Sequence, residues 1–302
     1  MPISRPRRCA LGGDTLKPSR FCYARVESAE EALSLLQAHG DDAAALAGGQ
    51  SLMAMMNMRV VAPDVLVDLG DCAELDFVRV AGEQIEIGAM FRQAALERWH
   101  GTASHLPLLS QALPHVGHYQ TRARGTVGGS LAHADPSAEI PLVAATLGAK
   151  IVLRSAEGER EVPAREFFTG PLDTVRAPEE LIWAVTFPAL SPAQPGGVGT
   201  AFDEVGFRRG DFAVAAFAAR VDTHTVVLGM GGIAGFPLVF EWARSALDEI
   251  EGELEDLVRS LDVLSDQHAD AAYRRRLVRT VAPKVLRRAA VVQEGSHLGS
   301  PA

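Results

Sequence analysis

The chain has 302 residues and a formal net charge of -9; 47% of its residues are hydrophobic and 22% are charged. These values are typical of a globular protein with a substantial hydrophobic core, and the length allows two or three domains. The negative charge argues against nucleic acid or an anionic membrane as the main partner, because both require a basic surface.

No apolar run reaches the roughly 20 residues that are needed to span a bilayer. The N-terminal stretch has an Arg-Arg pair but lacks the apolar segment of a signal peptide, so we interpret residues 1–20 as a disordered extension and expect a cytoplasmic protein. The three cysteines, Cys9, Cys22 and Cys72, form no C-x-x-C pair, which fits a reducing compartment. Isolated thiols cannot hold an iron–sulfur cluster or a structural zinc, so we expect any metal centre to belong to another chain.

The region before residue 191 mixes helix and strand signals. Ser28 and Glu31 form a capping box, and the helix that they start ends near Gly40. Apolar runs and alternation predict strands, while amphipathic spacing predicts helices. We expect strands at about residues 44–49, 64–69, 83–89, 149–155 and 179–188, and helical segments at about 51–59, 91–99, 106–114 and 138–147.

Residues 191–200, SPAQPGGVGT, are rich in proline, glycine and serine and predict a linker. Alternating patterns after it predict strands at residues 202–208, 212–221 and 225–232. From about Val239 onward we expect charged helices. The layout is that of an α+β protein, with two smaller mixed regions before residue 191 and a third region after it.

Two short loops combine paired glycines with a hydroxyl side chain, and each runs into an expected helix. The first is Ala47-Gly48-Gly49-Gln50-Ser51, and the second is Thr126-Val127-Gly128-Gly129-Ser130. Glycine lets the main chain approach a ligand closely, and successive free N–H groups form a nest for an anion. Two such loops could clamp both sides of a pyrophosphate, although either one alone is more often a tight turn.

Other motifs give weaker signals. The sequence from Gly229 to Ala234 matches G-x-G-x-x-A, but Pro237 prevents the helix that a dinucleotide-binding fingerprint must open, so we interpret it as a strand and turn. Neither glycine loop is followed by the lysine of a Walker A motif. The histidines show no metal-ligand spacing, and for His133 a place near a cofactor is favoured over a metal role.

Three segments in order resemble the FAD-binding medium subunit of the molybdenum hydroxylases: LAGGQSLMAMMNMR (46–59), TRARGTVGGSLAHADPSAEIP (121–141) and EFFTGPLDTVRAPEELIWAVTFP (166–188). This family includes aerobic carbon monoxide dehydrogenase, bacterial xanthine dehydrogenases and relatives that act on N-heterocycles and nicotine. The resemblance runs from about Phe21 to the C-terminal helices.

The resemblance implies an α+β protein with a two-subdomain FAD-binding fold of the vanillyl-alcohol-oxidase or PCMH type. The subdomains are expected at residues 21–74 and 75–190. After the linker at 191–200, it implies a smaller α+β domain of the carbon monoxide dehydrogenase flavoprotein type at 201–290, then a tail at 291–302.

The resemblance also implies the cofactor-binding residues, and it implies no catalytic or metal-binding residue in this chain. Gly48, Gly49, Gln50 and Ser51, with Thr126, Gly128 and Gly129, are expected to cradle the FAD pyrophosphate. The first loop continues with Ala47, Leu52, Met53 and Ala54, and the second includes Val127 and Ser130. Glu139 is expected at the adenosine end of FAD, and Ile182 near the flavin ring.

One position departs from the family pattern. Many relatives carry an aromatic residue followed by lysine close to the isoalloxazine, and the matching residues here are Phe202 and Asp203. A carboxylate in that place is expected to lower the flavin potential, unless Arg208 or Arg209 supplies the positive charge. The electron acceptor therefore stays open among NAD+, quinone, oxygen and a carrier protein.

The role implied by the resemblance is electron transfer within a heterotrimer. Substrate would be oxidised at a molybdenum cofactor on a large subunit, and electrons would pass through [2Fe-2S] clusters on a small subunit to FAD and then to an external acceptor. The large subunit would choose the substrate. Two alternatives remain: a self-contained FAD-dependent oxidoreductase, which predicts activity without partners, and a non-enzymatic nucleotide-binding scaffold, which predicts no flavin in the purified chain.

Overall fold

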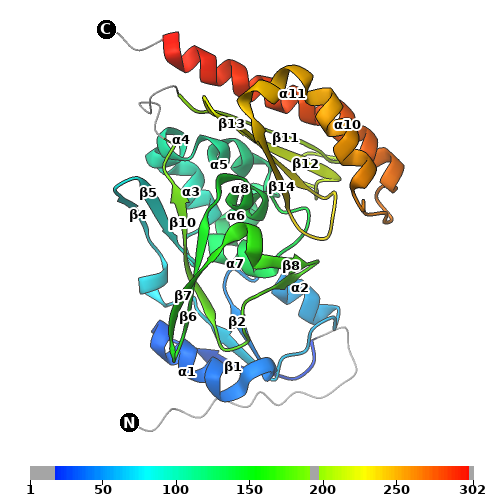
Figure 1. Cartoon of the computed structure of the whole chain (residues 1–302). Helices are drawn as coiled ribbons and strands as arrows, with labels where there is room; N and C mark the ends of the chain where they lie inside the picture. The colour runs from blue at the N-terminus through cyan, green and yellow to red at the C-terminus, as the bar shows by residue number, and fades with distance from the viewer. Residues whose placement is uncertain (1–17, 191–196, 299–302) are drawn as a thin grey trace.

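The computed structural model describes residues 18–190 and 197–298. Figure 1 shows three layers along the long axis: a small sheet with α1 near the N-terminus, a larger sheet with several helices in the middle, and a third sheet under the two C-terminal helices. The expected N-terminal extension and linker lie largely outside the described residues. Among the described helices, none combines the length and apolar character that crossing a bilayer requires.

The N-terminal unit is a three-stranded parallel sheet in the order β1-β3-β2. Parallel neighbours need crossover connections, and two helices provide them. The expected N-cap is confirmed, because the Ser28 hydroxyl accepts from the Glu31 amide at 3.2 Å. The reciprocal bond of the capping box differs, because the Glu31 carboxylate accepts at 3.2 Å from the amide of Glu27, the residue before the N-cap. The elements are β1 (Cys22–Arg25), α1 (Ala29–His39), β2 (Ala43–Leu46), α2 (Leu52–Asn57) and β3 (Val65–Asp68).

The central unit is a five-stranded antiparallel sheet in the order β4-β5-β10-β6-β7, and helices cover one of its faces. Its strands are β4 (Val78–Ala81), β5 (Gln84–Gly88), β6 (Lys150–Ser155), β7 (Gly158–Pro163) and β10 (Leu181–Pro188), and a small hairpin is formed by β8 (Phe168–Gly170) and β9 (Asp173–Thr174). Its helices are α3 (Gln93–Arg98), α4 (His100–His105), α5 (Pro107–Ala112), α6 (Tyr119–Arg124), α7 (Val127–His133), α8 (Glu139–Leu147) and α9 (Ala164–Phe167).

Two features of the central unit position the site. Every residue of α8 is buried, and the helix packs between the central and C-terminal sheets, so its first residue, Glu139, has a fixed place. In β10 a bulge falls between Ile182 and Ala184. Bulges re-aim side chains and are common beside functional sites.

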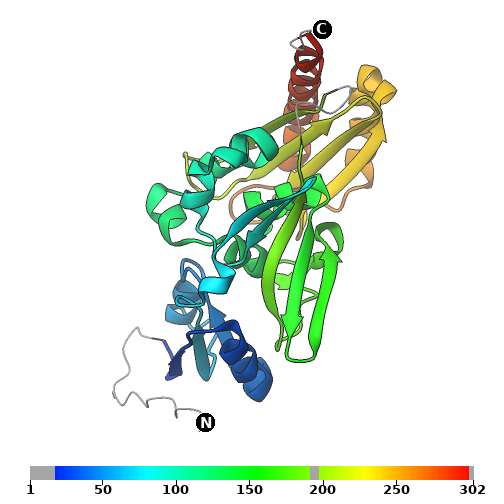
Figure 2. The same ribbon diagram turned by 90° about the vertical axis from the view of Figure 1, so that its left-hand side faces the viewer.

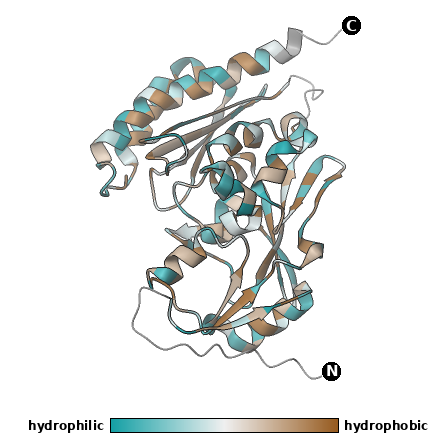
Figure 3. Cartoon of the chain, turned by 180° about the vertical axis from the view of Figure 1, so that it is seen from behind, coloured by the Kyte–Doolittle hydropathy of each residue, from teal (hydrophilic) through white to brown (hydrophobic). Residues whose placement is uncertain are grey.

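The C-terminal unit is a four-stranded antiparallel sheet, β11-β12-β13-β14, covered by two helices. Figure 2 shows this unit at the opposite end of the molecule from α1. Hydrophobic and hydrophilic residues alternate along the long helix α11 (Figure 3), and its buried residues include Val278, Val285 and Leu286. The elements are β11 (Gly199–Val205), β12 (Ala215–Val221), β13 (Thr225–Gly231), β14 (Leu238–Ala243), α10 (Ile250–Ser260) and α11 (Ala271–Leu298).

One expectation for this region needs correction. The segment from about Val239 begins as strand β14, which pairs with β13, and helix follows only later. Helix α11 continues to Leu298, into the segment expected as a tail from residue 291. The G-x-G-x-x-A match ends in a strand and turn as predicted, with Gly232 at φ +69° directly after β13.

Candidate cofactor-binding site

A cavity of about 640 Å³ lies between the N-terminal sheet, helix α7 and the start of β10, and the β11–β12 loop also reaches it. This volume is in the range of small-molecule and cofactor sites. The predicted residues that line it are Ala47, Gly48, Gly49, Gln50, Ser51, Leu52, Thr126, Gly128, Gly129, Ser130, Glu139 and Ile182. Three predicted residues are not among those lining it: Met53, Ala54 and Val127.

The first glycine loop directly follows the carboxyl end of β2, which is where ligands bind in sheets with parallel strands. Gly49 has φ +71°, a conformation that glycine adopts without strain. Within the described residues, the amides of Gly49, Gln50 and Ser51 have no hydrogen-bond partner, and the Ser51 hydroxyl makes no capping bond. This loop therefore offers the nest of free N–H groups that the sequence predicts.

The second glycine loop differs from the prediction. The Val127 amide donates to the Phe91 carbonyl at 3.0 Å, and the Gly128 amide donates to the Ala89 carbonyl at 2.9 Å. The Gly129 amide donates to the Thr126 hydroxyl at 3.0 Å, so Thr126 is the N-cap of α7. The expectation of a second nest of free amides is therefore wrong.

The glycines of both loops are also required by packing. A Cβ on Gly48 would overlap the Arg124 carbonyl, and one on Gly128 would lie 2.5 Å from the Ala89 Cβ. Gly48 thus lets the first loop touch the segment that leads into the second.

Behind the cavity lies a buried group of ionisable side chains. Glu139 is 7% exposed, and burial raises the pKa of its carboxyl to about 7. Glu204 is close enough to raise this pKa further, and its own Oε1 lies 3.0 Å from Nδ1 of His115. This hydrogen bond raises the pKa of His115, while Oε2 of Glu204 is buried and has no hydrogen-bond partner among the described residues. A pKa of about 7 leaves the Glu139 carboxyl partly protonated at neutral pH, and a hydrogen-bond donor or a cation in the cavity would favour its ionised form.

His133 lies in the cavity wall at the end of α7, which agrees with its expected place near a cofactor. Burial lowers the pKa of its imidazole, so the ring is neutral at physiological pH. Its Nε2 lies 4.0 Å from Oδ2 of Asp135. Across the described residues, no group of three or more histidine, cysteine, aspartate or glutamate side chains is arranged to hold a metal ion.

Asp203 is not in the expected place beside the site. Its Oδ2 lies 3.0 Å from Nη1 of Arg288 on α11, and Arg288 also donates to the Phe202 carbonyl at 2.6 Å. Asp203 is not among the residues that line the cavity, and neither are the exposed Arg208 and Arg209. The carboxylate is thus paired with another element and does not face the cavity.

The structure adds residues that the sequence did not indicate. Arg176 lines the cavity next to the start of β10, and Gly210, Asp211 and Phe212 line it from the β11–β12 loop. The latter three lie just before or at the start of the strand expected at residues 212–221, and the sequence suggested no cofactor role for them. Nothing in the local pattern around Arg176 distinguishes it from a surface arginine.

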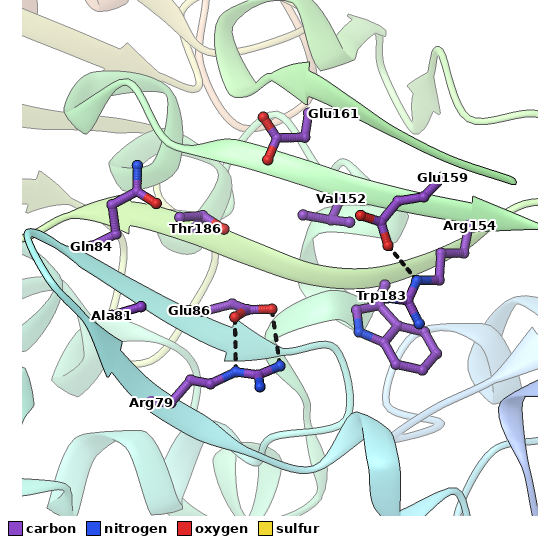
Figure 4. Close-up of a pocket in the computed structure, with 10 residues that line it drawn as sticks. All are labelled: Arg79, Ala81, Gln84, Glu86, Val152, Arg154, Glu159, Glu161, Trp183 and Thr186. Carbon is purple, nitrogen blue, oxygen red and sulfur yellow. Dashed lines mark hydrogen bonds and ion pairs between the residues drawn. The ribbon is translucent and has the colours of Figure 1, made fainter.

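A second, smaller depression lies on the outer face of the central sheet (Figure 4). Arg79 pairs with Glu86 at 2.8 Å, and Arg154 pairs with Glu159 while its guanidinium lies 3.6 Å from the ring centroid of Trp183. Charges that pair with one another in this way are typical of a solvated sheet face. We therefore assign no ligand to this depression.

The large cavity fits the pyrophosphate and ring system of FAD. Free loop amides and the Ser51 hydroxyl can donate to phosphate oxygens. The Oε1 of Gln93, in the cavity wall, is buried with no partner among the described residues and can accept a hydrogen bond from a ligand. The lining combines these polar groups with apolar side chains such as Met90 and Ile182, as flat aromatic cofactors require.

Comparison with known proteins covers most of the chain. The family described as "FAD binding domain in molybdopterin dehydrogenase" matches residues 19–190. The chain is 36% identical over 288 residues to 6-hydroxypseudooxynicotine dehydrogenase complex subunit alpha of Paenarthrobacter nicotinovorans, covering 91% of this chain and 96% of that protein. It is 36% identical over 234 residues to the carbon monoxide dehydrogenase medium chain of Afipia carboxidovorans, covering 76% of this chain and 79% of that protein.

Solved structures give the same result. Reconstituted CO dehydrogenase from Oligotropha carboxidovorans matches with a TM-score of 0.82 and 30% identity, covering 91% of this chain and 99% of the matched chain. This likeness confirms the predicted α+β FAD-binding fold.

Proposed function

The chain belongs to the FAD-binding medium subunits of the molybdenum hydroxylases, and from this premise we propose that it is the electron-transfer subunit of a molybdenum-dependent hydroxylase or dehydrogenase complex. Membership makes it an oxidoreductase subunit with FAD as cofactor. The proposal adds that electrons come from [2Fe-2S] clusters on a small subunit and leave to an external acceptor. Substrate reacts at the molybdenum cofactor of a large subunit.

One observation carries the proposal: within the described part of the chain the amides of Gly49, Gln50 and Ser51 have no hydrogen-bond partner, and these three residues line a cofactor-sized cavity. The names of the relatives, a complex subunit and a medium chain, support an assembly of several subunits. A cytoplasmic location belongs to the proposal too, and the free thiols of Cys22 and Cys72 support it.

The residues of this chain have separate tasks. The free amides of the first loop and the Ser51 hydroxyl bind the pyrophosphate, with Ala47, Gly48 and Leu52 beside them. Glu139 accepts hydrogen bonds at the adenosine end, and Ile182 packs against the flavin ring. FAD, when bound, supplies one- and two-electron chemistry.

On the second loop's side, Thr126 fixes the start of α7 through its bond to the Gly129 amide. Gly128 allows close packing on Ala89, and the Ser130 hydroxyl, in the cavity wall, is the remaining donor. We propose indirect roles for Met53, Ala54 and Val127, which shape the two loops from behind.

Purification of the native assembly through a tag on this chain tests the proposal. We expect two further subunits, bound FAD, and molybdenum and iron by elemental analysis. A chain that purifies without partners and oxidises an organic substrate with FAD alone would instead show a self-contained oxidoreductase. A folded chain that stays colourless with added FAD would show a scaffold.

A further inference from the structure

Arg176 has an unusual environment for an arginine. Its Nη1 donates to three main-chain carbonyls, those of Ala177, Pro178 and Glu180, at 2.8, 3.3 and 2.8 Å. Among the described residues, no carboxylate lies within ion-pair distance of its guanidinium, and no hydrogen bond is found for its Nε or Nη2. The side chain is half-buried and lines the cavity.

The carboxylate of Glu180 acts on Arg176 only from beyond ion-pair distance, because its oxygens are bonded to other groups. The two oxygens of Glu180 accept from Arg160 at 2.6 and 2.8 Å, and Oε2 also accepts from the Ala177 amide at 2.7 Å. These bonds, together with one from Arg160 to the Val175 carbonyl at 2.8 Å, hold the segment around Arg176 in place. The cation is therefore fixed at the cavity before any ligand arrives.

Half-buried cations are normally paired with an anion, because removing a charge from water is costly. Burial does lower the pKa of Arg176, but a guanidinium stays protonated in proteins. The other charged groups in the cavity wall are the carboxylates of Asp135, Glu139, Glu180 and Asp211. Arg176 is thus the one guanidinium or ammonium group among the described residues of this wall, and its free donors await an anion from the ligand.

We propose that Arg176 is the residue that stabilises the negative charge of the reduced isoalloxazine ring of bound FAD, a positioning and tuning role that rests on the proposed function. Two-electron reduction of the flavin with uptake of one proton leaves a negative charge at the N1 edge of the ring, and nearby charge tunes the potential. A fixed cation there favours the reduced form over the oxidised form.

The ring is a better partner for Arg176 than the pyrophosphate is. Nη1 is bonded to the Glu180 carbonyl, two residues before Ile182, the residue that we place against the ring. The pyrophosphate already has the free amides of the first glycine loop. The other charged residues considered for a place near the ring lie elsewhere: Asp203 is paired with Arg288, and Arg208 and Arg209 are exposed and outside the cavity wall.

The test compares Arg176→Gln, Arg176→Lys and the control Arg209→Gln in the FAD-loaded chain. The two-electron potential is measured by equilibration with reference dyes during dithionite titration, and the affinity for oxidised FAD by fluorescence. We expect Arg176→Gln to lower the affinity for reduced relative to oxidised FAD at least tenfold, which is about 30 mV for a two-electron couple. Affinity for oxidised FAD stays within about threefold, Arg176→Lys recovers part of the loss, and Arg209→Gln changes neither value.

Two results would overturn the proposal. The first is an unchanged potential in Arg176→Gln. The second is a large loss of oxidised FAD with an unchanged potential, which would assign Arg176 to the pyrophosphate. If Arg176→Gln does not fold by circular dichroism, Arg176→Met is judged by the same two readouts. Either negative result leaves the FAD-subunit assignment intact, whereas a parent chain that binds no FAD contradicts the proposed function itself.

Discussion

The two glycine loops look alike in sequence but differ in what they offer a ligand. In the first loop the amides of Gly49, Gln50 and Ser51 have no partner among residues 18–190 and 197–298, whereas in the second the amides of Val127 and Gly128 donate to carbonyls of the β5–α3 segment. The first loop can thus bind an anion through its main chain. The second side of the cavity must act through side chains, chiefly Ser130 and Glu139.

This difference separates two uses of glycine. Gly48 and Gly128 are glycines because a Cβ would overlap neighbouring backbone or Cβ atoms, and Gly49 is a glycine because its φ is positive. A glycine pair before a helix therefore does not by itself indicate an anion site. Whether such a loop can bind an anion depends on whether its amides already donate hydrogen bonds within the protein.

The largest effect is expected from adding a methyl group at the packed glycines. Gly128→Ala places a Cβ 2.5 Å from the Ala89 Cβ, and Gly48→Ala places one against Arg124. Overpacking of this kind lowers the free energy of unfolding by about 1–3 kcal/mol, and urea denaturation measures it.

Gly252→Ala is the matched control, because its added Cβ meets nothing within 4 Å in helix α10. There we expect a gain of about 0.5–1 kcal/mol. Equal stability of all three variants would show that the two loops do not need glycine for packing.

The second prediction concerns the pH dependence of stability on the second loop's side. The pKa of Glu139 is raised by burial from 4.5 to about 7, so the folded state without FAD holds an extra proton between these values. The favourable contribution of protonated Glu139 to the free energy of unfolding is complete below pH 4.5, and it is lost as the pH rises through about 7. Glu139→Gln should therefore be more stable than the parent near pH ~8, by on the order of 1–3 kcal/mol, and similar to it near pH ~4.

Urea denaturation of the two proteins without FAD at both pH values measures this difference. Glu204, His115 and Asp135 also act on Glu139, and they are present in both proteins. A difference that does not change with pH would contradict the raised pKa.

The smallest effects are expected from two hydroxyl groups, one in each loop. Thr126→Val removes the cap of α7, so the free energy of unfolding should fall by about 0.5–2 kcal/mol. Ser51→Ala removes a hydroxyl that makes no capping bond, so stability should stay within about 0.5 kcal/mol while FAD affinity falls several-fold. Thermal unfolding and FAD titration of both variants give the two readouts, and the reverse pattern would contradict the division between the loops.

Much of the fold could be predicted from the sequence, because capping and alternation are local. The N-cap at Ser28 and the strands before and after Gly48 are predicted by short patterns of adjacent residues. Strand β14 was missed because it lies at the edge of its sheet with partly exposed residues, so its short pattern is not separated from the charged helices that follow.

The site was predicted in part for the same reason. Both loops were found from local motifs, whereas Glu139 was expected only from the resemblance to the family. The amides of Val127 and Gly128 donate to the carbonyls of Phe91 and Ala89, which lie more than 30 residues earlier in the chain. The ion pair between Asp203 and Arg288 joins strand β11 to the distant helix α11. Such long-range contacts leave no trace in local spacing.

The central claim is that the free amides of the first loop bind the FAD pyrophosphate. Fluorescence titration of FAD onto the parent, Gly49→Asn and Gly49→Asp tests it most directly, since both substituents tolerate a positive φ and differ mainly in charge. We predict that Gly49→Asp binds FAD at least roughly tenfold more weakly than Gly49→Asn, because a carboxylate beside the nest repels the pyrophosphate. Equal affinity of the two variants would contradict the claim.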